Sequence, residues 1–215
     1  MPANDATIPD PDLERLLRQG LEELELDPGP ARDLARLAEL LHGWAQRINL
    51  TGHRTPEAIA RRLVLDALAL ERHLPEADSL ADLGAGAGFP GLPIALARPR
   101  CAVSLVESRE RRVHFQRAAI RTLGLGPRVQ SILGRAEALD PRPHAIAIAQ
   151  AMGAPDQVAR WLVPWVAPGG ALVIPGGEAA PAVAAVPGLA PAEIARYRVP
   201  LGGPPRTLWI ARRLD

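Results

Sequence analysis

The sequence predicts an α/β fold: a Rossmann-like, mostly parallel sheet of about seven strands that follows a helical N-terminal extension. Apolar residues recur at helical spacing before residue 75. After that point, short apolar runs alternate with helical stretches, which is typical of right-handed βαβ units in a parallel sheet. A glycine-rich loop follows the first apolar run. We therefore divide the chain into a helical extension, 1–74, and a ligand-binding domain, 75–215.

The extension is expected to hold three helices after a polar, mobile first dozen residues. A short helix is predicted over 12–19. A longer one is predicted over 29–47, where leucines recur three and four residues apart. The third begins at Thr55, an N-cap residue, with Pro56 at the first helical position.

The domain after residue 75 contains five short apolar runs that we predict to be strands: 80–84, 102–107, 129–133, 145–149 and 171–175. Helices are predicted between them, near 91–98, 109–123 and 155–166. The tail RTLWIARR is expected to form a last strand, with ARYRVPL as its hairpin partner. The Ala-, Pro- and Gly-rich segment 175–192 is expected to be a loop with one short helix.

Composition indicates a cytoplasmic protein without a membrane segment. Hydrophobic residues make up 47% of the chain and charged residues 23%, and the net charge is only +1. Cys101 is the single cysteine and enters an apolar run, so it is expected to be buried. The histidines are scattered without ligand spacing, so no metal site is expected. All 25 basic residues are arginine, a bias across the whole chain that does not by itself indicate RNA binding.

The loop DLGAGAGFPG matches two nucleotide-binding patterns. Gly86, Gly88 and Gly91 fit G-x-G-x-x-G, the dinucleotide pattern. Gly84, Gly86 and Gly88 fit G-x-G-x-G, the loop of S-adenosylmethionine (SAM) methyltransferases. Its position, after a strand and before a helix, is where an open parallel sheet binds ligands.

Two neighbouring residues favour SAM over NAD. Asp82 lies where dinucleotide folds usually have an apolar residue, and an acid there can order the loop and reach the amino-acid part of SAM through water. Pro90 removes an amide that would otherwise bind a pyrophosphate. Glu107, at the end of the second strand, is expected to accept hydrogen bonds from both ribose hydroxyls, whether the ligand is SAM or NAD. The alternative for Glu107 is an acid that caps the following helix.

Four segments carry a resemblance to a known family: WAQRINLTGHRTPEAIARRLVLDALAL, LADLGAGAGFPGLPIALARP, SLVESRERRVHFQRAAIRTLGL and GRAEAL. They resemble the glucose-inhibited division protein B family, the bacterial 16S rRNA guanine-N7 methyltransferases. The resemblance runs from about residue 35 to 175. It implies a class I SAM methyltransferase sheet with a helical extension, SAM as the cofactor, and ribosomal RNA or the small ribosomal subunit as the partner of a monomeric enzyme.

The resemblance also implies site residues. The cofactor-binding set is Asp82, Gly84, Gly86, Gly88, Phe89, Glu107, Ala136, Glu137 and Gln150. Within it, the glycines and Phe89 face the methionine part, Glu107 holds the ribose, and Ala136 with Glu137 flanks the adenine. RNA is expected to meet His53, Arg54, Arg61 and Arg62 on the extension. No catalytic side chain is expected, because guanine N7 is an unprotonated lone pair whose methylation needs alignment rather than a base.

The chain departs from the family pattern at three positions. Gln150 stands where the family has Arg after the fourth strand, Pro175 stands where it has Lys, and Leu63 replaces a His after Arg62. Two cationic groups expected to face the substrate are thus missing. Two alternatives stay open: a methyltransferase of this family with a different acceptor, and a paralogue that binds SAM or RNA without turnover.

Overall fold

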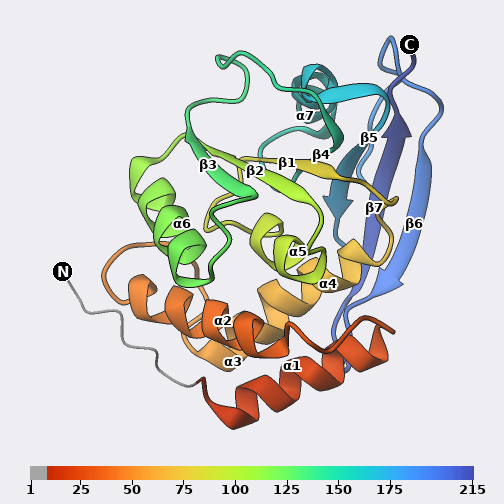
Figure 1. The fold of residues 1–215 in the computed structure, drawn as a ribbon. Helices are drawn as coiled ribbons and strands as arrows, with labels where there is room; N and C mark the ends of the chain where they lie inside the picture. Colours follow the sequence, from red (N-terminus) through yellow and green to blue (C-terminus); the bar gives the residue numbers. More distant parts are fainter. Residues whose placement is uncertain (1–8) are drawn as a thin grey trace.

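The computed structural model describes residues 9–215 as one α/β fold built on a seven-stranded sheet (Figure 1). The strands run in the order β3-β2-β1-β4-β5-β7-β6, and the strand order reverses between β1 and β4. Their bounds are β1 Ser79–Leu83, β2 Ala102–Glu107, β3 Val129–Leu133, β4 His144–Ala149, β5 Val166–Gly176, β6 Glu193–Arg198 and β7 Pro205–Arg212. All neighbours pair in parallel except β7, which is antiparallel to both β5 and β6.

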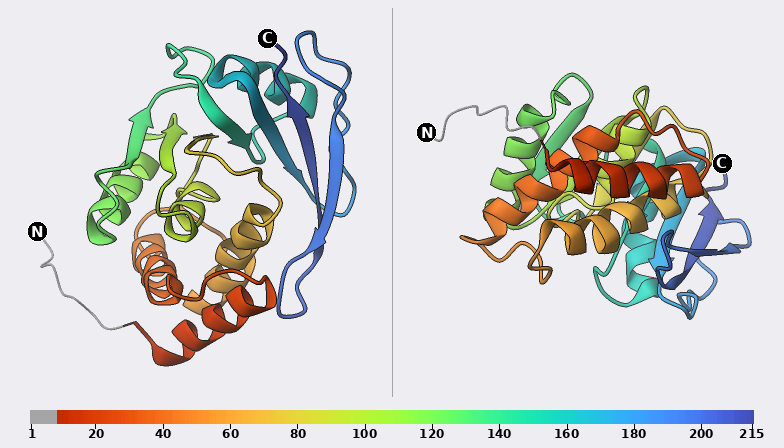
Figure 2. Two further views of the ribbon diagram at one scale, coloured as in Figure 1. Left: turned by 45° about the vertical axis from the view of Figure 1, so that its right-hand side comes forward. Right: turned by 90° about the horizontal axis from the view of Figure 1, so that it is seen from below.

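The helices cover the two faces of the sheet unequally (Figures 1 and 2). Their bounds are α1 Pro11–Glu23, α2 Ala31–Ala45, α3 Pro56–Ile59, α4 Leu65–Glu71, α5 Gly91–Ala97, α6 Glu110–Thr122 and α7 Pro155–Leu162. One face packs on α5, α6 and the four helices before β1, in a single hydrophobic cluster. The opposite face packs on α7 and on apolar residues of the segment after β5. The extension therefore shares its core with the sheet.

Alternation along the central strands produces this two-sided core. Leu80 of β1 belongs to the cluster under the extension, whereas Ala81 and Leu83 belong to the cluster under α7. Successive side chains of a strand point to opposite faces, and a sheet covered on both faces needs apolar residues at every position. This requirement explains why the strands appear in the sequence as continuous apolar runs.

The third helix of the extension contains a π-helical turn, η1, at Ala60–Val64 between α3 and α4. The Leu65 N–H donates to the carbonyl of Ala60, five residues back, and defines the wide turn. The helix starts as predicted, because the Thr55 side chain accepts from the Ala58 N–H. The π turn itself has no signal that we recognised in the sequence.

Two sequence-based predictions about segments need correction. The helix predicted over 155–166 ends at Leu162, continues as a 3₁₀ turn, η2 Val163–Trp165, and is followed at once by β5, which begins five residues earlier than predicted. The short helix expected within 175–192 is absent from the structure: its residues form bends, turns and irregular chain between β5 and β6. Three prolines between these strands remove backbone donors that a helix would need. The first dozen residues were predicted to be mobile. Of these, 1–8 lie outside the described residues, and α1 already begins at Pro11.

Candidate cofactor and acceptor site

The glycine-rich loop joins the carboxyl end of β1 to α5, beside the point where the strand order reverses. Gly84 has a φ of +67°, a left-handed conformation that side chains other than glycine rarely adopt. The Met152 side chain fills the place where a Cβ on Gly84 would be. The loop therefore needs glycine here both for its turn and for the close approach of the segment after β4.

Asp82 orders the loop from inside the protein. Its Oδ2 accepts a hydrogen bond from the Gly91 N–H at 2.8 Å, which ties the start of α5 to β1. Its Oδ1 is buried and has no hydrogen-bond partner among residues 9–215. Burial raises the pKa of the Asp82 carboxyl to about 7; the Gly91 hydrogen bond opposes this rise, and the charge of Glu107 adds to it. The loop-ordering role predicted for Asp82 is thus present in the structure.

Glu107, the last residue of β2, connects the loop to α6. Its Oε2 accepts from the Gly86 N–H at 2.9 Å and from Arg112 Nη1 at 3.3 Å, and its Oε1 accepts from the Arg109 N–H at 2.8 Å. Only 4% of the Glu107 side chain is exposed. The carboxylate is thus held between two backbone donors, and its contact with the side chain of Arg112 is the longer one.

A cavity of about 220 Å³, which we call the first cavity, opens at the carboxyl ends of these strands. Four of the residues predicted to bind the cofactor line it: Gly84, Glu107, Ala136 and Glu137. Residues that the sequence analysis did not assign to this site also line it, among them Ser108, Arg109, Arg112, Arg135, Met152 and Trp161. The spacing after each strand could have indicated the arginines, since they follow β2 and β3, but nothing in the sequence indicated Met152 or Trp161.

A second cavity, of about 30 Å³, lies on the other side of the loop tip. Its walls include Arg62 and Asp66 from the extension, Phe89 and Pro90 from the loop, and Gln150 after β4. Gln150, which was predicted to bind the cofactor, lines this second cavity and not the first. Since Ala151 and Met152 line the first cavity, the segment after β4 reaches both. Asp66 was not predicted from the sequence.

The remaining predicted residues lie outside both cavities. Arg61 is half-buried and pairs with Glu57 one turn earlier, at 2.9 Å, so its charge is partly neutralised. His53 and Arg54 lie in the loop before α3. Gly86 and Gly88 shape the loop through positive φ values of 59° and 85°. Phe89, unlike these residues, lines the second cavity, and it is also partly buried against the core under the extension.

The departures from the family pattern have defined places. Gln150 is exposed, and the next residue, Ala151, has a φ of +54°. Pro175 lies in β5 opposite Leu208 of β7 and is half-buried. Neither position therefore supplies a cation, but Gln150 still presents an amide to the second cavity.

The largest of the described cavities, about 420 Å³, lies elsewhere, between α1, α2 and the start of α3. Four acids line it, Asp10, Asp12, Glu39 and Glu57, against the single cation Arg15. It has no contact with the glycine loop. We place the functional site at the smaller cavities because the loop, the ordered Asp82 and Glu107 all converge there.

One side-chain pair was not anticipated. Ser104 Oγ lies 2.9 Å from His144 Nε2, in a buried contact that also includes Gln130. Burial lowers the pKa of His144, whereas the hydrogen bond between its Nδ1 and the carbonyl of Arg142 opposes this shift. His144 is the first residue of β4, so the pair is at the opposite end of the sheet from the glycine loop, and we assign it to the core.

Among residues 9–215, no group of three or more His, Cys, Asp or Glu is arranged to hold a metal ion. Nor does this part of the chain contain a helix with the length and hydropathy of a membrane span.

Comparison with known proteins adds independent findings. The model of the GidB family, described as rRNA small subunit methyltransferase G, matches residues 31–183. A ribosomal RNA small subunit methyltransferase G from Xanthomonas campestris is 39% identical over 176 residues, which cover 81% of this chain and 78% of that protein. One of the same name from Stenotrophomonas maltophilia is 44% identical over 128 residues, which cover 60% of this chain and 59% of that protein.

Solved structures with low sequence identity share the fold. A geranyl diphosphate methyltransferase, solved with GPP and sinefungin, superposes with a TM-score of 0.57 at 16% identity, over 69% of this chain and 77% of that one. Cofactor-bound Rv0187 from MTB superposes with a TM-score of 0.54 at 18% identity, over 83% of this chain and 89% of that one. At such identities the likeness shows the α/β fold, a Rossmann-like class I methyltransferase sheet, and the predicted fold class is confirmed.

Proposed function

Because the chain belongs to the GidB family, the rRNA small subunit methyltransferases G, we propose that it transfers a methyl group from SAM to guanine N7 of 16S ribosomal RNA. One observation of this structure carries the proposal: the Gly86 N–H of the glycine loop donates to Glu107, beside a cavity at the reversal point of the sheet. This is where a parallel sheet places a nucleoside, with an acid at the end of the second strand for the ribose.

The residues of the first cavity fit SAM by their chemistry. The Glu107 carboxylate can accept from ribose hydroxyls if its two long side-chain contacts, with Arg112 at 3.3 Å and Ser108 at 3.4 Å, give way. We assign the methionine part to the backbone of the loop; Asp82 lies behind the loop, with its Oδ1 buried, and does not line the cavity. Ala136 and Glu137 border the adenine end. When bound, the cofactor supplies an electrophilic methyl group on a sulfonium.

The chain's own contribution to the reaction is then positional. Guanine N7 carries a lone pair and no proton, so no side chain has to remove one. The protein needs to hold the base in line with the methyl group and to exclude water, and alignment of this kind lowers a barrier substantially. The second cavity, bordered by the loop tip and by Gln150, is the place we assign to the base.

We assign the two parts of the chain different roles. Residues 75–215 hold the cofactor, and residues 1–74 form one wall of the acceptor side through Arg62 and Asp66. His53, Arg54 and Arg61 are proposed to contact phosphates, since arginine binds phosphate bidentately and stays charged. We expect a monomer that acts in the cytoplasm; sedimentation at assay concentration tests the oligomeric state.

A second candidate function rests on Gln150 and Pro175. With both expected cations absent, a methyltransferase of this family that acts on a different acceptor fits the same cofactor site. A SAM- or RNA-binding paralogue without turnover is the remaining alternative.

The test is methyl transfer itself. The purified protein is incubated with methyl-labelled SAM and with small-subunit rRNA, free and assembled into particles, from cells that lack this modification. The label should appear as N7-methylguanosine at one position. Binding of SAM without transfer to either substrate would reject rRNA as the acceptor and leave the two alternatives.

A further inference from the structure

Asp66 places a carboxylate in the wall of the second cavity, just after the π turn η1. Its side chain is 13% exposed. Arg206 of β7 holds it from behind: Nε lies 3.0 Å from Oδ2 and 3.2 Å from Oδ1, and Nη2 lies 2.9 Å from Oδ2. Arg206 therefore fixes the orientation of the carboxylate, and the longest of these contacts is at Oδ1.

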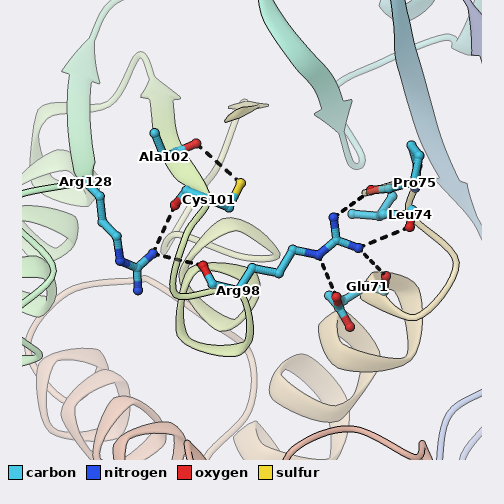
Figure 3. Close-up of polar contacts among 7 residues, drawn as sticks. All are labelled: Glu71, Leu74, Pro75, Arg98, Cys101, Ala102 and Arg128. Carbon is cyan, nitrogen blue, oxygen red and sulfur yellow. Dashed lines mark hydrogen bonds and ion pairs between the residues drawn. The ribbon is translucent and has the colours of Figure 1, made fainter. Parts of the chain in front are cut away.

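The same helix has a second ion pair whose role is purely structural (Figure 3). At its other end, Glu71 pairs with Arg98 at 2.6 Å, and Arg98 also donates to the carbonyls of Glu71, Leu74 and Pro75. That guanidinium closes the end of α4. Glu71 lines neither the first nor the second cavity. Because the Glu71–Arg98 pair already anchors α4, anchoring alone does not explain why Asp66 lies on the acceptor side.

A carboxylate at this place favours one kind of ligand edge. A carboxylate has no donor to offer a phosphate oxygen, so it suits a base rather than the RNA backbone. Each carboxylate oxygen accepts two hydrogen bonds; Oδ2 already accepts two from Arg206 and Oδ1 one, so one position remains at Oδ1. Guanine carries an amine donor, N2, on its Watson–Crick edge, where adenine has only a C–H. RNA-binding proteins read unstacked bases by such contacts.

The other walls of the cavity agree with a base edge. Phe89 and Pro90 give it an apolar side continuous with the cofactor loop. Gln150 carries an amide donor suited to guanine O6, which neighbours N7. The volume of about 30 Å³ admits the edge of a base rather than a whole one.

We propose that Asp66, held by Arg206, selects guanine by accepting a hydrogen bond at Oδ1 from the N2 amine of the accepting base. This inference rests on the proposed function and names the residue that gives the site its base specificity. It assigns Arg206 a positioning role, because Arg206 reaches the base only through Asp66.

The experiment compares guanosine with inosine, which lacks only the N2 amine, at the accepting position of small-subunit rRNA assembled by ligation. The wild-type protein should methylate the inosine RNA with a kcat/KM about tenfold to a hundredfold lower, the loss expected of one hydrogen bond to a charged acceptor. In Asp66→Asn this guanosine-to-inosine ratio should fall to within about threefold of one, because an amide is a weaker acceptor than a carboxylate. SAM affinity should stay unchanged in both proteins.

The matched control is Glu71→Gln, which removes a charge of similar burial from the same helix without touching the second cavity. It should lower thermal stability as Asp66→Asn does but keep the wild-type ratio. The ratio does not depend on how much of a preparation is folded. Equal turnover of both RNAs by the wild-type protein would overturn the inference without any variant, as would a wild-type ratio in Asp66→Asn. Absence of transfer to guanosine RNA by the wild-type protein would instead reject the proposed function.

Discussion

The Gly86 N–H and Oε2 of Glu107 are 2.9 Å apart, so the loop after β1 is tied to the last residue of β2. The two residues are 21 positions apart in the sequence. Because the same carboxylate also accepts from the backbone at the start of α6, one side chain sets the relative positions of three elements around the first cavity. Its removal should therefore affect both the shape of the cavity and the ligand inside it.

Glu107→Gln should weaken the binding of SAM and S-adenosylhomocysteine about tenfold to a hundredfold, since an amide accepts less strongly from ribose hydroxyls than a carboxylate does. Titration calorimetry measures the change, and NAD should not bind to either protein. Glu110→Gln, a change of the same type at the exposed start of α6, is the control and should leave the affinity intact. Unchanged affinity in Glu107→Gln would mean that the ribose lies elsewhere.

Gly84→Ala should destabilise the protein by roughly 2–4 kcal/mol, the sum of a strained backbone conformation and the displacement of Met152. Gly124 has nearly the same φ, +66°, but no atom lies within 4 Å of the place that a Cβ would take there. Gly124→Ala should therefore show only the backbone share, about 1–2 kcal/mol. Chemical denaturation compares the two. Adding Met152→Ala should recover part of the loss in Gly84→Ala and none in Gly124→Ala.

Asp82 should make the stability of the protein depend on pH. Its folded pKa of about 7 is above the ordinary value of 3.8, so between about pH 4 and pH 7 the folded state binds more protons than the unfolded state. The contribution of Asp82 is present in full below pH 4 and is lost as the pH rises to 7. The Asp82→Asn protein, whose side chain stays uncharged, should therefore gain stability relative to wild type as the pH rises. Between pH 4 and pH 8 its free energy of unfolding should gain on the order of 4 kcal/mol at most.

Urea unfolding of both proteins at pH 5 and pH 8 measures this difference, and other titrating groups cancel in the comparison. A gap that stays constant with pH would show that the Asp82 carboxyl titrates normally.

Arg98→Ala should cost about 3–5 kcal/mol, because it leaves the buried Glu71 carboxylate unpaired and the end of α4 without its donors. The double variant Arg98→Met with Glu71→Leu should recover more than half of this loss, since no buried charge then remains. Arg72→Ala breaks an exposed pair with Glu25 and should cost less than about 1 kcal/mol. Similar losses in Arg98→Ala and Arg72→Ala would contradict the structural role of the buried pair.

Restoring the two missing cations, with Gln150→Arg and Pro175→Lys together, should change methyl transfer to small-subunit rRNA less than tenfold. Gln150 is exposed, and arginines elsewhere on the surface can provide phosphate contacts. No transfer by the parent protein, followed by clear transfer in the double variant, would favour the paralogue without turnover. No transfer by either would favour a different acceptor.

The sequence determined the order and kind of the elements, because local rules govern them. Buried strands require apolar residues at every position, and β2 and β3 match the predicted ranges at both ends. The Thr55 cap is a contact three residues long, and the glycine loop is defined by neighbouring residues, so both were predictable. Family motifs added Glu107, Ala136 and Glu137, which do line one cavity.

Only the tertiary structure decided which of these residues meet. Gln150 separates from Glu107 into the second cavity because its strand, β4, lies on the other side of β1 from β2. Asp66 and Arg206 are 140 positions apart and come together only because β7 folds back beside β5, and so brings the C-terminal hairpin against α4. Local periodicity carries no information about such pairs, since their contact depends on the closure of the whole sheet around the helical extension.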